Sequence, residues 1–277
     1  MRPLLFGHRL TLTAMLGLLI IAANLIGAIG APVLAPFPEA EIVGDAWASA
    51  DGSYWLGLDN LGRDIFSRLL FGARMSIGLS LMITCLSFSI GIVMGFAAAI
   101  AKGWLDILLS RIADLLLSMP TLIFAFVVLS VLGTDLAVLV LTLAVLDSVK
   151  VFRVARALAM NISALEYVEV AKLRGEGLWW IITREVLPNA MLPLIAEFGL
   201  RFTFAFLFVA ALSFLGLGVQ PPAADWGSMV RDYREVIALD VPAPLYPAAA
   251  IALMTIGVNF VVDWIAQLHA GGHGDGA

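Results

Sequence analysis

Two oppositely charged side chains, Glu197 and Arg201, lie four residues apart within a long apolar stretch of the sequence. On a helix this spacing places both side chains on one face, with the acid N-terminal to the base, which is the better order for an ion pair. Arg201 lies eight residues beyond Pro193, which corresponds to about 12 Å along a helix. If this stretch crosses a membrane, an unpaired charge at that depth costs at least about 2.5–3.5 kcal/mol.

The sequence leaves three interpretations of this pair open. Glu197 and Arg201 neutralise each other and fix their helix to a neighbour, near Asp147. Alternatively, Arg201 faces the interior of a helix bundle and binds an anionic group such as a carboxylate. In the third interpretation, the long side chain of Arg201 extends to the inner membrane surface.

Sequence motifs for other kinds of chemistry are missing. There is no Gly-x-x-x-x-Gly-Lys-Ser/Thr loop, so this chain does not itself cradle ATP phosphates. Neither a His-Glu-x-x-His metal pattern nor a Gly-x-Ser-x-Gly nucleophile context occurs, and the three histidines lie near the termini. The single cysteine, Cys85, rules out a disulfide framework. We therefore expect no catalytic residue, no metal site and no cofactor bound by this chain.

The composition indicates an integral membrane protein. Hydrophobic residues make up 61% of the 277 residues and charged residues only 13%, with a mean hydropathy of +1.00. Soluble domains are usually about 45–50% apolar and about 25% charged, so lipid must solvate much of this surface. The net charge of −5, without a basic tract, implies no nucleic-acid partner.

Six stretches are long and apolar enough to cross a bilayer, which takes about 20 residues. They are Leu10–Ile29, Ile77–Ala101, Ile112–Leu132, Leu136–Val154, Met191–Leu215 and Tyr246–Leu268. The first is longer than the core of a secretory signal, so we expect it to remain as a helix. The sequence thus predicts an all-α polytopic bundle of six transmembrane helices.

The basic residues predict the orientation, because cytoplasmic segments collect Lys and Arg. With the N-terminus inside, ten basic residues are cytoplasmic: Arg2, Arg9, Lys102, Arg111, Lys150, Arg153, Arg156, Lys172, Arg174 and Arg184. Five lie outside: Arg63, Arg68, Arg74, Arg231 and Arg234. We therefore expect a cytoplasmic segment 1–9, a transmembrane domain 10–268 with outer loops 31–74 and 217–243, and a flexible tail 269–277, with both termini cytoplasmic.

The cytoplasmic loop 161–189 predicts two short helices. Ser163 and Glu166 have capping-box spacing, so a helix should start at Ala164. Gly175 is a natural stop, because glycine takes the left-handed conformation without strain. A second helix, Leu178–Val186, should end before Pro188. From the residues alone, this loop could also be an amphipathic surface helix that rests on the bundle through Leu165, Val168 and Ala171.

Three stretches carry a resemblance to a known family. Glu169–Gly175, followed by Val186–Pro188, resembles the EAA loop of ABC-importer permeases, with departures at Val170 and Val186. Two others are similar to the second permease subunit of the peptide/nickel family: Leu56–Arg68 with Gly72–Arg74, and Ala211–Gly218 with Pro221, Pro222 and Asp225–Gly227. The resemblance covers about Leu56 to Asp263, although the family usually has small or apolar residues near Arg201.

This resemblance implies a type I ABC-importer permease fold in the bacterial inner membrane. Its partners would be a second, homologous permease, two ATPase subunits that bind ATP and Mg, and an external substrate-binding protein. Coupling to an ATPase would involve Ser163, Glu166, Glu169, Ala171, Gly175 and Pro188. The binding protein would dock near Asp59, Arg63, Asp64, Asp225 and Trp226, and candidate residues of the translocation path are Glu197, Arg201 and Ser213.

The cargo and the transport class leave alternatives. The resemblance favours di- and oligopeptides, but nickel chelates, opines, glutathione and oligosaccharides are also compatible with it. A self-sufficient secondary transporter usually shows an internal repeat, and none is visible in this sequence. An intramembrane enzyme or receptor is a further alternative, which would need a nucleophile and base within the spans.

Overall fold

The computed structural model describes residues 4–5, 8–101, 103–239 and 241–271. Apart from a short antiparallel strand pair, β1 (Leu4–Leu5) with β2 (His8–Arg9), the regular elements of this part are helical. The longer ones are α1 (Leu12–Leu34), α2 (Ile65–Ala101), α3 (Gly103–Leu117), α4 (Thr121–Leu132), α5 (Leu136–Ser163), α8 (Leu187–Phe214) and α10 (Leu245–Gly271). The predicted all-α class is therefore confirmed for the described residues.

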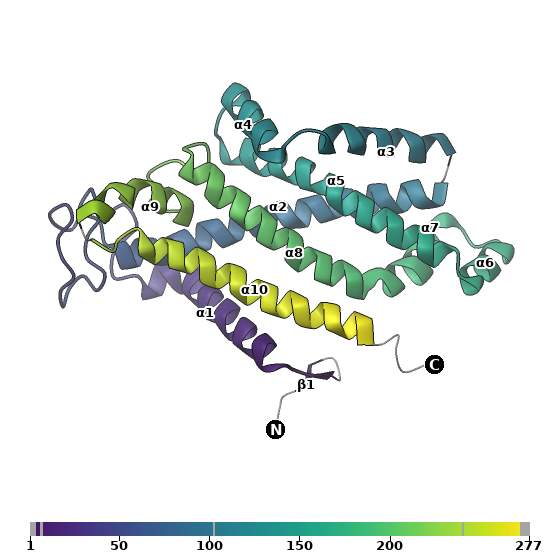
Figure 1. The fold of residues 1–277 in the computed structure, drawn as a ribbon, viewed down its shortest axis with the longest axis horizontal. Helices are drawn as coiled ribbons and strands as arrows, with labels where there is room; N and C mark the ends of the chain where they lie inside the picture. Colours follow the sequence, from purple (N-terminus) through teal and green to yellow (C-terminus); the bar gives the residue numbers. More distant parts are fainter. Residues whose placement is uncertain (1–3, 6–7, 102, 240, 272–277) are drawn as a thin grey trace.

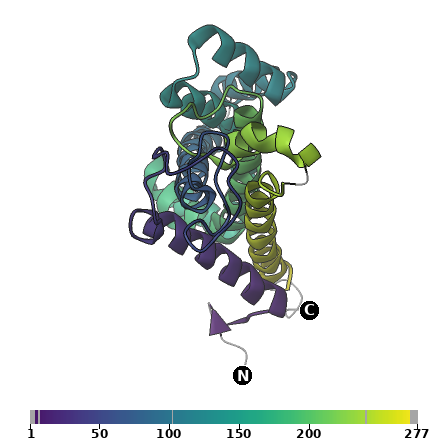
Figure 2. The same ribbon diagram turned by 90° about the vertical axis from the view of Figure 1, so that its left-hand side faces the viewer.

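The long helices lie side by side along the long axis of the molecule (Figure 1). Helices α3 and α4 lie on one side of this bundle and α1 on the other, in both views (Figures 1 and 2). Helices α2 and α5 approach closely at two glycines. A Cβ atom at Gly91 would lie 2.6 Å from the Val151 side chain, and one at Gly95 would lie 2.8 Å from the Phe152 carbonyl oxygen. Small residues at these positions allow the two backbones to meet.

Four helical segments of the described chain are long and apolar enough to cross a membrane: Leu12–Leu34, Ile65–Ala101, Ile181–Phe214 and Leu245–Leu268. The pair α3 and α4 makes a fifth if it is one broken span, since the two helices meet at a bend of 87°. Helix α5 is also long, but it carries four charged residues: Asp147, Lys150, Arg153 and Arg156. The chain is thus a multi-pass membrane protein with four or five candidate spans by this measure.

The third predicted span, Ile112–Leu132, is wrong as a single helix. Helix α3 ends at Leu117 and α4 begins at Thr121. Pro120 separates them, because proline lacks the N–H of a helix interior and disfavours helical geometry at the preceding residue. Proline therefore breaks a stretch whose hydropathy is continuous.

Other predicted boundaries also move. Helix α2 begins at Ile65 rather than Ile77, because the Asp64 carboxylate caps it and accepts hydrogen bonds from the Ser67 backbone N–H (2.7 Å) and hydroxyl (2.6 Å). Helix α5 continues to Ser163 instead of ending at Val154, so Arg156 lies in the same helix as Lys150 and Arg153. Helix α10 extends to Gly271, so residues 269–271 are not a flexible tail, and the predicted tail 272–277 lies outside the described residues.

The two ends of the bundle differ in structure. The segment between α1 and α2, together with α9 (Trp226–Tyr233) and the short 3-10 helix η2 (Arg234–Leu239), forms one end, and Figure 2 looks onto it. We call this end the outer cap, residues 35–64 and 226–239, after the side of the membrane on which the sequence predicts its loops. The short helices α6 (Glu166–Leu173) and α7 (Leu178–Trp180) form the opposite end (Figure 1). Helix α1 begins and α10 ends on the side nearer α6 (Figure 1).

One buried carboxylate organises the outer cap. Asp59 accepts hydrogen bonds from the backbone N–H groups of Leu61 (2.8 Å) and Arg63 (3.0 Å). It also pairs with the guanidinium groups of Arg63, at 2.7 Å, and Arg68, at 3.3 Å. All three charged side chains are buried. A carboxylate that pairs with two guanidinium groups and accepts two backbone hydrogen bonds in this way fixes the loop that leads into α2.

We expect Asp59→Asn to destabilise the protein by about 3–5 kcal/mol, because it leaves two buried guanidinium groups without their counter-charge. Thermal unfolding in detergent should show a large fall in Tm. Asp51→Asn is the matched control, because Asp51 lies in an exposed turn of the same segment and accepts hydrogen bonds from the Ser53 and Tyr54 N–H groups. Equal Tm values for the two variants would contradict the central role of Asp59.

Candidate functional site

The short helix α6 is closed at its C-terminal end as the sequence predicts. Gly175 has a φ of +81°, which is the left-handed conformation. The Glu176 N–H donates to the Ala171 carbonyl oxygen at 3.2 Å, which is the hydrogen bond of a Schellman motif. The predicted role of Gly175 as the stop of this helix is therefore confirmed.

The predicted start of this helix is wrong. Helix α6 begins at Glu166, not at Ala164, and Ser163 is the last residue of α5. Ser163 is still in the preceding helix and thus lacks the extended backbone of an N-cap residue. The Leu165 carbonyl oxygen instead accepts the first hydrogen bonds, from the N–H groups of Val168 (3.0 Å) and Glu169 (3.3 Å).

The second predicted helix does not end before Pro188. Residues Leu178–Trp180 (α7) lead into a π-helix, η1 (Ile181–Val186), and this continues directly into α8. The Leu187 N–H donates to the Ile182 carbonyl oxygen, which is the π-helical spacing. Pro188 follows in the first turn of α8, where the missing proline N–H is tolerated. The wider π-helical turn lets the chain pass the proline without a break.

Helix α6 has two different faces. Val168 and Ala171 are fully buried. Val168 packs in a cluster with Ile162 of α5, Ile181 and Val186 of η1, and Ala190 of α8. The predicted contact of Leu165 with the bundle is only partial, because this side chain is 47% exposed. The inner face of α6 thus joins the end of α5 to the start of α8.

The exposed face of α6, which points away from the bundle, combines apolar and acidic side chains. Leu173 is 83% exposed, Trp179 of α7 is 77% exposed, and Val170 is also exposed. Glu166 and Glu169 are exposed beside them. Burial and the neighbouring Glu185 raise the pKa of the Tyr167 hydroxyl, so it stays neutral. A mixed apolar and charged surface of this kind is typical of a protein contact.

The predicted ion pair within α8 is present and belongs to a larger cluster. Arg201 Nε lies 2.7 Å from Glu197 Oε1, and Arg201 Nη1 lies 3.5 Å from Asp147 Oδ1 of α5. Lys150 Nζ lies 3.5 Å from the same Asp147 oxygen. We call Asp147, Lys150, Glu197 and Arg201 the charge cluster. The sequence analysis missed Lys150 as a member, although Asp147 and Lys150 have the i, i+3 spacing of neighbours on a helix.

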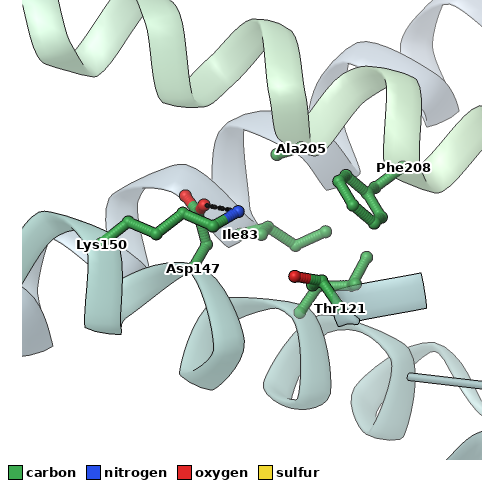
Figure 3. A pocket seen from close by; sticks show the side chains of 7 residues that line it. Ile83, Thr121, Asp147, Lys150, Ala205 and Phe208 are labelled. Atoms are coloured by element: carbon green, nitrogen blue, oxygen red, sulfur yellow. Dashed lines mark ion pairs between the residues drawn. The ribbon is translucent and has the colours of Figure 1, made fainter. Parts of the chain in front are cut away.

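Aromatic rings and a small hollow border the charge cluster. Phe204 lies beneath the guanidinium group of Arg201 at 5.0 Å and near the Lys150 ammonium at 5.8 Å, and Phe208 lies 5.7 Å from the same ammonium. Figure 3 shows Asp147 and Lys150 of α5 across from Thr121 of α4 and Phe208 of α8. The hollow between them measures about 10 Å³, which is room for about one water molecule.

Ser213 does not line this region. Its side chain is fully buried, its hydroxyl accepts from the Val219 N–H at 3.2 Å, and its carbonyl oxygen accepts from Arg231 Nη1 at 3.1 Å. Ser213 therefore stabilises the turn that leaves α8. The structure does not support its prediction as a residue of the path.

The residues predicted to dock a partner are buried in the outer cap and at its border. They are Asp59, Arg63, Asp64, Asp225 and Trp226. Asp225 caps α9 by accepting from the Ser228 N–H at 3.0 Å, and it accepts from the Ser76 hydroxyl of α2 at 2.7 Å. Burial raises the pKa of Asp225, whereas these hydrogen bonds oppose the rise. In this conformation these side chains lie beneath the surface of the outer cap, and their docking role stays a prediction.

Glu39 is a residue of the outer cap that the sequence analysis missed. Its carboxylate accepts from the Ala224 N–H at 2.9 Å, and its carbonyl oxygen accepts from Arg68 Nη1 at 3.0 Å. Glu39 therefore ties the two outer loops together. These contacts join residues far apart in the sequence, so local spacing gave no signal for them.

Comparison with known proteins supports the resemblance. Residues 87–271 match the family described as binding-protein-dependent transport system inner membrane component. The dipeptide transport system permease protein DppC of Alkalihalophilus pseudofirmus is 33% identical over 90% of this chain and 83% of its own. The glutathione transport system permease protein GsiD of Pectobacterium atrosepticum is 33% identical over 76% and 70%, and the di/tripeptide permease DppC of Pseudomonas aeruginosa is 34% identical over 89% and 84%. The chain belongs to the family of inner membrane permease components of binding-protein-dependent transport systems.

Proposed function

We propose that this chain is a six-span permease subunit of an ATP-driven peptide importer, coupled to its ATPase through α6. The observation that carries this proposal is the pair of faces on α6. Its buried face packs against the end of α5 and against η1, and its exposed face presents Leu173, Glu166 and Glu169 at the end of the bundle opposite the outer cap. A movement imposed on α6 by a partner would therefore reach α5 directly and α8 through η1.

In the proposed assembly, two ATPase subunits bind ATP and Mg and close in the cytosol. This chain contributes no catalytic residue and is not an enzyme. Closure of the ATPases shifts α6, and the π-helix η1 adapts at the junction with α8, since such segments often accompany functional sites. With a second permease, the bundle alternates between inward- and outward-open states by rocking as a rigid body, as other membrane transporters do.

The six spans would be α1, α2, the broken pair α3 and α4, α5, η1 with α8, and α10. Helix α5 can cross the membrane despite its charges because they are paired. Asp106 of α3 accepts two hydrogen bonds from Arg156, and Asp114 of α3 pairs with Arg153. A charge with a counter-charge costs less to place in a span than an unpaired one. Both termini and α6 then lie in the cytoplasm, with the bacterial inner membrane as the site of action.

The proposed cargo is a short peptide, because the relatives are named for dipeptides, di/tripeptides and glutathione. Nickel chelates and opines are the alternatives within the same machinery. An external binding protein would dock on the outer cap, where Ile42, Trp55 and Leu61 are exposed. The buried residues Asp59 and Asp225 would support this surface from within.

The orientation can be tested by cysteine labelling. In a Cys85→Ala background, Leu173→Cys should resist a membrane-impermeant maleimide in intact spheroplasts and react after lysis. Trp55→Cys is the matched control, because it is also exposed but lies in the outer cap; it should react without lysis. Labelling of Leu173→Cys from outside would overturn the proposed topology.

Coupling can be tested at the stop of α6. Gly175→Val should strain the left-handed residue by at least about 1 kcal/mol. This strain should displace the exposed face of α6. We expect normal membrane abundance, loss of uptake, and loss of the ATPase stimulation caused by the loaded binding protein. Gly177→Val is the matched control, because Gly177 lies in the same loop, has no left-handed φ and has open space around its Cβ position.

A charge reversal tests the exposed face of α6 itself. Glu169→Lys changes an exposed side chain without disturbing the buried face of α6. It should also abolish stimulated ATPase activity, because the charge at the ATPase contact is inverted. Normal stimulation in both Gly175→Val and Glu169→Lys would remove α6 from the coupling path.

A further inference from the structure

We propose that the charge cluster is a cargo-binding site in the translocation path, selective for molecules that carry both an ammonium and a carboxylate group. This inference rests on the proposed function and deepens it, because a short peptide with free ends is such a molecule. The cluster would bind the ammonium through Asp147 and Glu197, and the carboxylate through Lys150 and Arg201.

The first argument for a cargo site is the balance of charges within the cluster. Helix α5 contributes one acid and one base, Asp147 and Lys150, and α8 contributes Glu197 and Arg201. The two residues that each helix contributes to the cluster therefore carry no net charge. If α5 and α8 separate, neither helix is left with an unpaired charge in the membrane. A site that opens and closes needs this property, whereas a fixed bridge needs only one acid and one base.

The contacts within the cluster are incomplete. Both contacts of Asp147 Oδ1 are 3.5 Å long, and Asp147 Oδ2 is buried with no hydrogen-bond partner among the described residues. Glu197 Oε1 and Arg201 Nε are close, but the described structure does not align them as a hydrogen bond. By contrast, Arg156 makes two aligned hydrogen bonds to Asp106 between α5 and α3. Buried polar groups normally find partners, so the cluster has capacity for a ligand that the Arg156 bridge lacks.

The location suits a path that opens. The cluster lies about halfway along α8 and α5, and its hollow also contacts Thr121 at the start of α4 (Figure 3). In this conformation the hollow holds about one water, so a peptide can enter only when the helices around it move apart. The contact between Arg201 and Asp147 is the one ion pair of the cluster that joins α5 to α8. A bound zwitterion would replace it, with its carboxylate against Arg201 and its ammonium against Asp147.

The arrangement of two acids and two bases determines which cargo the site prefers. A zwitterion exchanges partners with the two ion pairs, and every charge keeps a counter-charge throughout. A cargo with only one charged end leaves an acid or a base of the cluster without its partner. An uncharged cargo such as an oligosaccharide gains nothing from either pair. The site therefore favours short peptides over their end-blocked derivatives.

The first test neutralises one whole pair at a time in the reconstituted complex with its ATPases, second permease and binding protein. The variants are Asp147→Asn with Lys150→Gln, and Glu197→Gln with Arg201→Gln, neither of which leaves an unpaired charge. We expect dipeptide uptake per ATP hydrolysed to fall at least tenfold, with abundance and stimulated ATPase activity within twofold of wild type. The control is Asp114→Asn with Arg153→Gln, an ion pair one turn further along α5, which should keep uptake within twofold.

The second test leaves the cluster unchanged and remains decisive if the double variants do not accumulate. In a cysteine-free complex, Thr121→Cys reports occupancy of the hollow through its rate of reaction with a small thiol reagent. A free dipeptide at millimolar concentration should slow this reaction several-fold, without the binding protein present. The same dipeptide with an N-acetyl and a C-amide group should not slow it.

The outcomes separate the two proposals. Unchanged uptake in both double variants, or equal protection by free and blocked dipeptide, would overturn the charge cluster as a cargo site while peptide import stands. Absence of both peptide uptake and peptide protection in the wild-type complex would overturn the proposed cargo, and the inference with it.

Discussion

A charge removed from water must keep a counter-charge, and this constraint shapes the chain at three levels. In the outer cap, Asp59 pairs with two buried guanidinium groups. Towards the end that α6 occupies, Arg156 and Asp106 bridge α5 to α3. Between these levels, the charge cluster holds two acids and two bases between α5 and α8. Paired in this way, charged residues can occupy helices that would otherwise be too polar to enter a membrane.

The geometry of the pairs distinguishes fixed joints from adjustable ones. The outer cap combines short ion pairs with several hydrogen bonds, including those of Asp225 to α2 and of Glu39 to the second outer loop. The charge cluster joins α5 to α8 only through the 3.5 Å contact between Arg201 and Asp147. At the end opposite the outer cap, Val168 of α6 shares an apolar cluster with Ile162 of α5 and with Ile181 and Val186 of η1, which continues into α8. Of the three charged levels, the charge cluster thus has the longest ion-pair contact between helices.

Local patterns in the sequence predicted what depends on local physics. The spacing of Glu197 and Arg201 predicted their ion pair, and Gly175 predicted the end of α6, because both depend on helix geometry alone. The sequence failed where neighbours in space decide. Ser163 has a capping pattern, but the preceding helix continues through it. Asp59 and Asp225 look like exposed loop acids, yet guanidinium groups and α2 bury them. The hydropathy of the sequence likewise gave no sign of the break at Pro120, because proline changes backbone geometry and not polarity.

Helix α6 packs against α5 and against η1, which continues into α8, so it adjoins both helices of the charge cluster and connects the proposed cargo site with the proposed coupling helix. Ile162 at the end of α5 and Ala190 at the start of α8 share one apolar cluster with α6. Asp147 and Arg201 lie further along the same helices. A rigid helix transmits a displacement of its end along its whole length, whereas the π-helix between α6 and α8 can absorb a small change in register. Movement of α6 would thus alter the separation of α5 and α8 at the charge cluster, where one 3.5 Å ion pair joins the two helices beside their apolar contacts.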